Sequence, residues 1–281
     1  MIATVGTFDG VHRGHRYLID RLVEEGAARG LEPVVVTFDR HPLELVRPGE
    51  APAAIISARE QDEIFRSLGV RVIRLPFTPL LRAMTGSQFA AMLGRAHGVK
   101  ALMLGYDNHM GADRTTEPVA PGIELVKCPP LPADSGGAVS SSAIRALIAA
   151  GEVDRAAAML GRPYVLTGTV VGGRQLGRRL GFPTANLDVD GRMLLPAPGV
   201  YAGRAMGHTA VVNVGRRPTV DGADAPLSVE VHILDFSGDL YGCDLSVELT
   251  RRLREERKFA SVEELGRAIA LDIESARLAD A

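Results

Sequence analysis

The first 160 residues of the chain alternate short apolar runs with longer segments that carry apolar residues at helical spacing. Short runs rich in Val, Ile and Leu are typical of strands buried on both faces of a parallel sheet. The segments between them repeat apolar side chains one helical turn apart, as in Leu18 with Leu22. The pattern predicts strands at Ile2–Val5, Pro33–Phe38, Arg71–Leu75 and Lys100–Leu104, and helices at Arg16–Arg29, Ser57–Leu68 and Thr85–His97. This βαβ repetition predicts an α/β domain on an open parallel sheet, which binds ligands at the carboxyl ends of its strands.

The hydrophobic periodicity changes near residue 164, where segments of alternating apolar and polar residues are separated by Gly and Pro turns. It predicts an antiparallel sheet or small barrel with strands at Tyr164–Val171, Val200–Met206, Ala210–Val214, Leu227–Phe236 and Leu245–Thr250. One helix closes the chain, with a capping-box pattern at Ser261 and Glu264. Its predicted core stripe is Val262, Leu265, Ile269 and Ile273. A helix-like segment, "EVDRAAAML", ends just before Gly161-Arg162-Pro163, so we expect two domains, 1–160 and 161–281.

Composition excludes several classes of protein. The chain has 281 residues, 46% hydrophobic and 23% charged, which suits two globular cores. Basic and acidic residues number 17 and 18 up to residue 160 and 15 and 16 after it, about −1 in each part, so no nucleic-acid partner is expected. Cys128 and Cys243 lie outside any CxxC or His/Cys cluster, which predicts neither a zinc site nor a disulfide. With no signal-peptide pattern and no apolar run of about 18 residues, we expect a cytoplasmic protein without a membrane partner.

The segment "ATVGTFDGVHRGH" at 3–15 places His12 and His15 between a predicted strand and a predicted helix. Three interpretations compete for this pair. A zinc site would need further ligands, which no nearby cluster offers. The histidines could instead be structural. The third interpretation is an anion site, in which Gly6, Gly10 and Gly14 let the backbone approach a ligand at a helix N-terminus and the imidazoles donate to phosphate oxygens.

These residues resemble a known family. "GTFDGVHRGH" is similar to the first nucleotide-binding motif of the HxGH nucleotidyltransferases, in the form found in bacterial bifunctional riboflavin kinase/FAD synthetases. "TFDRHP" at 37–42, "LGYD" at 104–107 and "SSSAIR" at 140–145 resemble the family's later motifs, in the same order. The resemblance implies a Rossmann-like domain that transfers AMP from ATP to FMN, with ATP phosphates held by His12 and His15. It further implies nucleotide or phosphate contacts from Gly6, Thr7, Asp9, Gly14, Asp107, Ser141, Ser142 and Arg145.

The chain departs from the family pattern at three places. Asp107-Asn108-His109-Met110-Gly111 stands where the family has aromatic residues in a form like DFxFG. The segment 112–139 is shorter than the family leads one to expect, and Ser142 replaces the usual threonine. These departures bear on the FMN pocket and on the rate of adenylyl transfer.

The segment "GGRQLGRRLGFPTANL" at 172–187 is rich in Gly and Arg but has no GK[ST], so it is not a Walker A loop. In an extended chain Thr184 and Asn186 point to the same side. Their hydroxyl and carboxamide oxygens suit Mg²⁺, with phosphates and waters completing the coordination, and the glycines let backbone N–H groups approach the phosphates. In "LSVEVHILDF" at 227–236, Val229, Val231 and Ile233 form one face, and Glu230 and His232 fall on the other.

The second half is similar to the riboflavin kinase half of the same bifunctional family. The resemblance rests on GxPTAN, "NVGRRPT" at 213–219, the Glu of "VEVHILDF", "DLYG" at 239–242 and "LREERKF" at 253–259. It implies a six-stranded antiparallel barrel that converts riboflavin and ATP into FMN and ADP. Glu230 would take the proton of the ribityl 5′-hydroxyl, and Thr184 and Asn186 would hold Mg²⁺. Gly173, Gly177, Gly181 and Pro183 would shape the nucleotide site.

Two other functions remain open at this point. The altered Asn108–Gly111 stretch is compatible with a monofunctional riboflavin kinase that carries a weakened adenylyltransferase domain. A flavin-binding regulator without catalysis is the alternative from a different class. It would not require His12, His15, Thr184, Asn186 and Glu230 together. The implied small-molecule partners are riboflavin, FMN, FAD and ATP, with Mg²⁺ as cofactor, and the oligomeric state is open.

Overall fold

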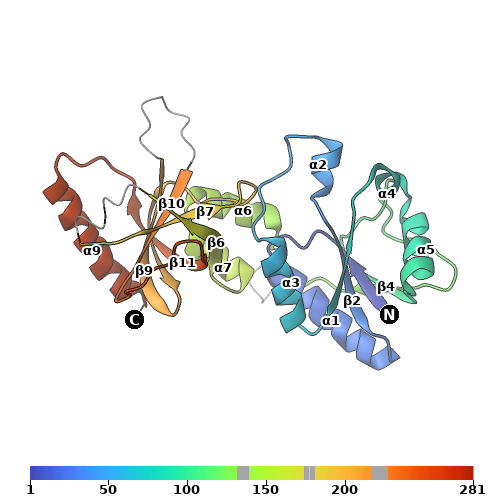
Figure 1. Cartoon of the computed structure of the whole chain (residues 1–281). Helices are drawn as coiled ribbons and strands as arrows, with labels where there is room; N and C mark the ends of the chain where they lie inside the picture. Colours follow the sequence, from blue (N-terminus) through green and yellow to red (C-terminus); the bar gives the residue numbers. More distant parts are fainter. Residues whose placement is uncertain (132–138, 174–176, 178–180, 217–226, 281) are drawn as a thin grey trace. The chain divides into compact units, whose positions relative to one another are not determined.

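The computed structural model describes residues 1–131, 139–173, 177, 181–216 and 227–280. They form two compact units, Met1–Ser140 and Ser141–Ala281 (Figure 1). Within the described residues, no helix has the length and apolar composition that crossing a membrane requires.

The first unit is an α/β fold on a parallel sheet of order β3-β2-β1-β4-β5. The helices and strands follow the predicted alternation, and β1, β2 and β3 have the predicted bounds. In chain order they are β1 (Ile2–Val5), α1 (Arg13–Arg29), β2 (Pro33–Phe38), α2 (Pro42–Val46), α3 (Ala58–Ser67), β3 (Arg71–Leu75), α4 (Pro79–Ala83), α5 (Gly86–His97), β4 (Ala101–Gly105) and β5 (Glu124–Cys128).

The sheet has helices on both faces. Ala3 and Val5 of β1 pack in one cluster with Phe89 and Leu93 of α5. Side chains alternate along a strand, so Ile2 faces the other way, and there it lies against Gly26 of α1. The parallel register brings the carboxyl ends of β1, β2 and β4 to the same edge of the sheet. The loops after these strands therefore lie where ligands of such sheets bind.

The second unit is a closed barrel of order β10-β7-β6-β11-β8-β9, which confirms the predicted barrel. All of its strand pairs are antiparallel. Its elements are α6 (Ser141–Ala150), α7 (Val153–Leu160), β6 (Tyr164–Val171), β7 (Ala185–Val189), β8 (Gly199–Ala205), β9 (His208–Arg216), β10 (Leu227–Ile233), β11 (Asp244–Glu255) and α9 (Val262–Asp280).

The boundary between the compact units falls at Ser140 and Ser141, earlier than the change of periodicity predicts. The reason is that α7 packs on β6 and β11 of the barrel. Val153, Ala156 and Leu160 on this helix are completely buried. The turn between α6 and α7 also lies close to the barrel, because a Cβ at Gly151 would be 2.9 Å from the hydroxyl of Tyr201 in β8. The two helices thus belong to the core of the second unit.

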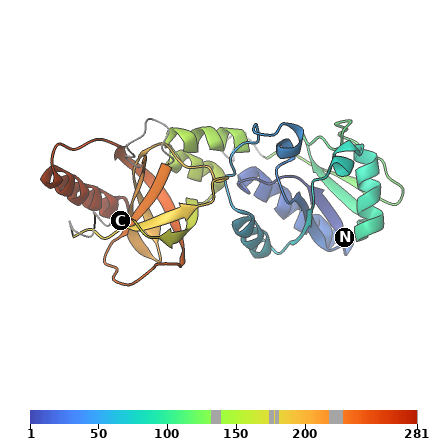
Figure 2. The same cartoon turned by 45° about the horizontal axis from the view of Figure 1, so that its top comes forward.

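The closing helix α9 packs along β8, β9 and β11 (Figure 2). Its predicted core stripe is partly wrong, since Val262 is exposed and Leu265, Ile269 and Ile273 are only partly buried. The buried line is instead Ala268, Asp272 and Ala276. Alanine lets the helix approach the barrel closely, and Asp272 is buried because its carboxylate accepts hydrogen bonds from the Arg254 guanidinium at 2.8 and 2.9 Å.

Candidate active sites

The loop between β1 and α1 brings His12 and His15 together. His12 is the N-cap residue of α1, and its Nδ1 accepts a hydrogen bond from the His15 backbone N–H at 3.3 Å. The two rings stack with centroids 3.6 Å apart and planes at 15°. A Cβ at position 14 would lie 3.3 Å from the His12 ring, so Gly14 makes room for the stack. The pattern His-x-Gly-His is therefore explained by the geometry of this helix start.

Burial affects the protonation of His15. Desolvation, and secondarily the neighbouring His12, lowers the pKa of His15 well below the usual histidine value of 6.5. The buried Nδ1 of His15 has no hydrogen-bond partner within the described part of the chain. Because Nδ1 of His12 accepts a backbone N–H, a neutral His12 carries its proton on Nε2, where it can donate to an anion. No group of three or more His, Cys, Asp or Glu among the described residues is arranged to hold a metal, so the zinc interpretation gains no support there.

The residues before the pair adopt a strained backbone. Phe8 and Val11 have φ values of 50° and 35°, a region that costs non-glycine residues roughly 1–3 kcal/mol each. Contacts from elsewhere hold this loop: the Gly6 N–H donates to the Val36 carbonyl at 3.1 Å, and the Ile55 N–H donates to the Asp9 carboxylate at 2.9 Å. Phe8 packs edge-on against the His15 ring, 5.2 Å between centroids. Asp9 therefore helps to fix the loop through a hydrogen bond to at least one of its carboxylate oxygens.

The other residues predicted for this site lie on two further segments. Asp107 is exposed in the turn after β4, the strand next to β1. Its neighbour Asn108, one of the departures from the family pattern, donates from Nδ2 to the Val5 carbonyl at 3.2 Å and so joins the ends of the two strands. Ser141, Ser142 and Arg145 lie in the first turns of α6, which belongs to the second unit. Ser141 and Arg145 are four residues apart and share a helix face.

The barrel aligns three polar side chains on neighbouring strands. Glu230 of β10 pairs directly with Asn186 of β7 on one side and with Asn213 of β9 on the other. Directly opposed residues project from the same face of a sheet, with Cβ atoms about 5 Å apart. Val229 and Val231 point the opposite way and are buried, as predicted, so the polar row lies outside the barrel core. Asn213 is the member of the row that the sequence analysis did not select, although it begins the "NVGRRPT" segment.

The segment before β7 lies against this row. A Cβ at Gly173 would be 2.2 Å from the Asn186 amide nitrogen, so only glycine allows this approach. The His232 Nδ1 donates to the Pro183 carbonyl at 2.7 Å, which holds the residue before Thr184 against β10. Continuing the β7–β10 register places Thr184 opposite His232. Gly177 accepts a hydrogen bond from the Phe182 N–H at 2.8 Å, and Gly181 precedes Phe182. Positions 174–176 and 178–180 of the segment, and 217–219 of "NVGRRPT", lie outside the described residues.

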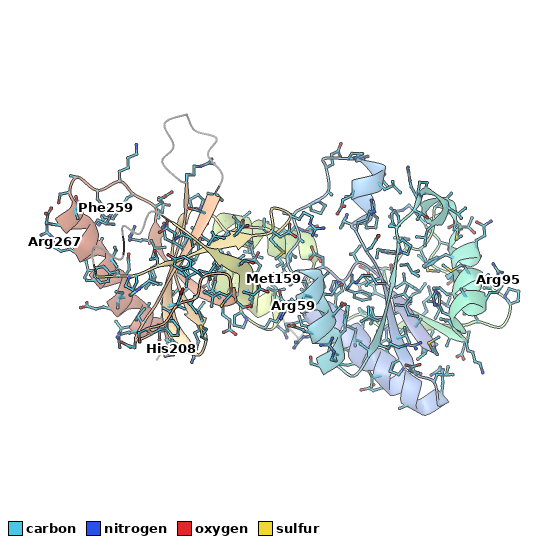
Figure 3. The ribbon with its side chains drawn as sticks, viewed as in Figure 1. Arg59, Arg95, Met159, His208, Phe259 and Arg267 are labelled. Atoms are coloured by element: carbon cyan, nitrogen blue, oxygen red, sulfur yellow. The ribbon has the colours of Figure 1, made fainter. Side chains whose placement is uncertain are left out.

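The oxygen atoms on this face suit a hard divalent cation. Mg²⁺ is usually bound by one or two protein oxygens and otherwise by phosphates and waters. Asn186 offers a carboxamide opposite the Glu230 carboxylate, and Thr184, two residues earlier in the chain, offers a hydroxyl. The "LREERKF" segment begins on β11 and ends beyond it at Phe259, which is labelled in Figure 3. The guanidinium carbons of Arg254 and Arg257 lie 5.5 and 4.8 Å from the centroid of the Phe259 ring. These cation–π contacts order the chain between the barrel and α9.

Comparisons with known proteins match the two parts of the chain to two different family models. The family model for FAD synthetase matches residues 1–121, and the model for riboflavin kinase matches residues 160–279. A bifunctional riboflavin kinase/FMN adenylyltransferase of Pseudomonas fluorescens is 38% identical, with 98% of this chain and 92% of the relative covered. A Bacillus subtilis protein of the same name is 30% identical, with 98% and 91% covered. A solved structure described as a macrolide-efflux protein from Streptococcus pneumoniae superimposes with a TM-score of 0.87 at 31% identity, over 98% of this chain and 93% of that one.

Proposed function

The chain belongs to the bifunctional riboflavin kinase/FMN adenylyltransferase family, and from that membership we propose how its residues carry out the two reactions. The C-terminal half phosphorylates riboflavin to FMN with ATP. The N-terminal half transfers AMP from ATP to FMN, which yields FAD and pyrophosphate. The observation that carries this assignment is that two different family models match separate parts of one chain.

In the kinase reaction, Glu230 is the proposed base. As the 5′-hydroxyl of riboflavin attacks the γ-phosphorus of ATP, the carboxylate takes the hydroxyl proton and ADP leaves. Asn186 and Asn213 flank Glu230 in register, and we propose that they help to orient the carboxylate and the phosphate group. The His232 side chain holds the Pro183 carbonyl against β10, and this contact also fixes the start of the next residue, Thr184.

Thr184 and Asn186 are the proposed Mg²⁺ ligands of this half. When bound, the ion neutralises charge on the phosphate oxygens of ATP. Gly173 supports this role, because its missing side chain leaves the Asn186 carboxamide room to turn toward a ligand. Gly177, Gly181 and Pro183 shape the same segment and are proposed to face the nucleotide.

In the adenylyl transfer, no covalent enzyme intermediate is needed. A phosphate oxygen of FMN attacks the α-phosphorus of ATP and pyrophosphate leaves. His12 and His15 are proposed to donate to phosphate oxygens as charge moves toward the leaving group, at a helix N-terminus whose dipole favours anions. Gly6, Thr7, Asp9 and Gly14 form the loop that presents them. Asp107 is proposed to bind the ribose or adenine end, and Ser141, Ser142 and Arg145 a second group of phosphate oxygens.

The test is a crossed pair of variants in the full-length protein. Glu230→Gln should lower FMN formation from riboflavin by about 10²–10⁴-fold and leave FAD formation from supplied FMN unchanged. His12→Asn should do the reverse, lowering FAD formation by about 10²–10³-fold, because asparagine keeps the N-cap of α1 but lacks the imidazole. Products are separated by chromatography after incubation with riboflavin or FMN, ATP and Mg²⁺. Formation of FMN but never FAD by the unmodified protein would mean a monofunctional kinase, and no product at all would mean a binding protein.

A further inference from the structure

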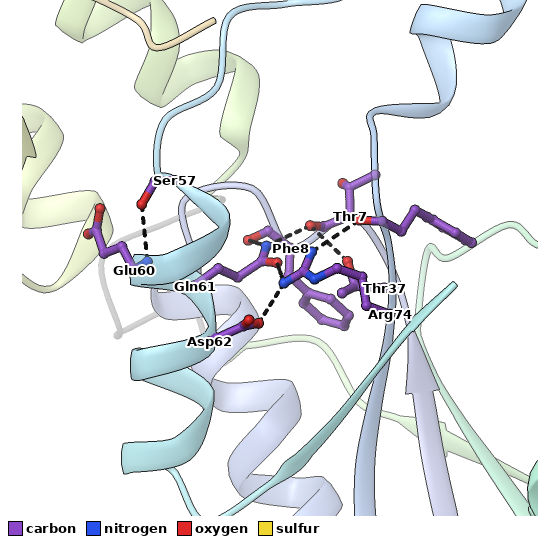
Figure 4. A network of polar contacts seen from close by, with 9 residues as sticks. Thr7, Phe8, Thr37, Ser57, Glu60, Gln61, Asp62 and Arg74 are labelled. Atoms are coloured by element: carbon purple, nitrogen blue, oxygen red, sulfur yellow. Dashed lines mark hydrogen bonds and ion pairs between the residues drawn. The ribbon is translucent and has the colours of Figure 1, made fainter. Parts of the chain in front are cut away.

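A buried glutamine of α3 reaches into the strained loop between β1 and α1. Gln61 is 6% exposed. Its Nε2 donates to the Thr7 carbonyl at 3.0 Å and to the Phe8 carbonyl at 3.2 Å (Figure 4). One amide group thus donates to two consecutive carbonyls where the chain turns through the positive φ of Phe8. The Phe8 carbonyl also accepts a hydrogen bond from the Val11 N–H at 3.0 Å. Neither carbonyl belongs to the sheet, so Gln61 supplies contacts that regular structure does not.

Arg74 of β3 fixes the direction of this amide. Its Nη2 donates to Gln61 Oε1 at 3.0 Å, and its Nη1 donates to the carbonyl of Phe38 at the end of β2 at 3.1 Å. The same guanidinium pairs with the Asp62 carboxylate. Since arginine can only donate, the oxygen of Gln61 must face Arg74 and the NH₂ group must face the loop. Arg74 therefore determines which end of the Gln61 amide meets Thr7 and Phe8.

The segment before α3 and the strand β2 hold the loop at further points. The Ile55 N–H donates to the Asp9 carboxylate, and the Thr37 hydroxyl of β2 donates to the Thr7 carbonyl at 3.4 Å. Consecutive loop residues 7, 8 and 9 are thus all held from outside the loop. The next turn of the chain starts α1 with the stacked histidines, so a change in this loop would move His12.

We propose that Gln61 and Arg74 are positioning residues for the adenylyl transfer. They hold the loop after β1 in the conformation that presents Gly6, Thr7 and the histidines to the phosphates of ATP. This inference rests on the proposed function of the N-terminal half. Neither residue touches ATP or FMN in this scheme, and both act through the carbonyls of Thr7 and Phe8.

The experiment compares three variants of the full-length protein. Gln61→Met keeps the length of the side chain without polar atoms. Gln61→Glu can still accept from Arg74 but cannot donate to the loop, so it tests the two donated bonds specifically. Glu63→Gln is the control on the same helix. Among the described residues, the exposed Glu63 carboxylate forms an ion pair with Arg59 alone.

We expect both Gln61 variants to lower kcat/KM for ATP in FAD formation by about tenfold to 10²-fold, the effect of a small misplacement of catalytic groups. Riboflavin phosphorylation by the same preparations should be unchanged, and Glu63→Gln should behave as the unmodified protein. Hydrogen exchange of peptides covering residues 6–16 should be faster in the Gln61 variants alone. Unchanged FAD formation in both Gln61 variants, or a loss that only follows the fraction of unfolded protein, would overturn the inference.

The exchange measurement separates this inference from the proposed function. If the unmodified protein forms no FAD, the proposed activity of the N-terminal half fails. Faster exchange in Gln61→Met and Gln61→Glu, but not in Glu63→Gln, would still support the positioning of the loop. Equal exchange in all three variants would contradict it.

Discussion

At the scale of single residues, the stacked pair of histidines and the polar row on the barrel show what sequence reasoning reaches. The spacing of His12 and His15 predicts that the two rings are within reach of one another, and the strand alternation around Glu230 predicts which side chains share its face, because both follow from local geometry. Gln61 and Asn213 are missed, since their partners lie far along the chain and each residue type is common on exposed surfaces. Only the tertiary fold brings Gln61 to Thr7 or Asn213 to Glu230.

The lowered pKa of His15 makes the first unit sensitive to acid. A histidine whose folded pKa is below its unfolded value of 6.5 favours folding while it is neutral. This contribution is fully present above pH 6.5 and is lost as the pH falls from 6.5 toward the folded pKa. We expect the thermal unfolding midpoint of the first unit to fall over that interval. His15→Gln, which does not titrate, should flatten the fall, and equal slopes for both proteins would contradict the assignment.

At the scale of helices and strands, buried apolar runs are predicted well and weakly patterned elements are not. The strands β1, β2, β3 and β6 have the predicted bounds. The strands β5 and β7 were not predicted, because Glu124 and Lys127 interrupt the first and Asn186 and Asp188 the second. The short helices α2 and α4 were not predicted either. In α9 the predicted N-cap is confirmed, since the Glu264 N–H donates to the Ser261 hydroxyl, but a buried aspartate cannot be foreseen without its Arg254 partner.

The Arg254–Asp272 pair should be essential for docking α9 on the barrel. Asp272 is buried, and its removal leaves the Arg254 guanidinium without its carboxylate partner. Losing one member of a buried pair costs about 3–5 kcal/mol. We expect Asp272→Ala to lower the free energy of unfolding of the barrel unit by that amount in urea titrations. The exposed pair of Arg277 with Asp235 is the matched control, and Asp235→Asn should cost about 1 kcal/mol or less.

At the scale of the whole molecule, the family models and the compact units divide the chain in different places. The riboflavin kinase model begins at residue 160, whereas the barrel unit begins at Ser141. The predicted boundary at 160/161 follows the change in periodicity, which reports where the strands begin. It does not report that α7, a helix that precedes those strands, packs on β6 and β11.

Two fragments test where the kinase half begins. The fragment 141–281 keeps α6 and α7 and should unfold cooperatively and phosphorylate riboflavin. The fragment 161–281 lacks α7, whose Val153 and Leu160 are completely buried, and each such side chain stabilises a fold by about 2 kcal/mol. It should have a lower midpoint in thermal unfolding or precipitate during purification. Equal stability of the two fragments would place the boundary at residue 161.

The strand order of the first unit also has a consequence for its synthesis on the ribosome. β1 leaves the exit tunnel before the other strands of its sheet, yet it lies in the centre of that sheet, between β2 and β4. One of its sides can pair once β2 has been made, but the other must wait until residues 101–103 emerge. Throughout that interval the nascent chain carries an apolar strand with an open edge, which is a binding site for chaperones and a starting point for aggregation.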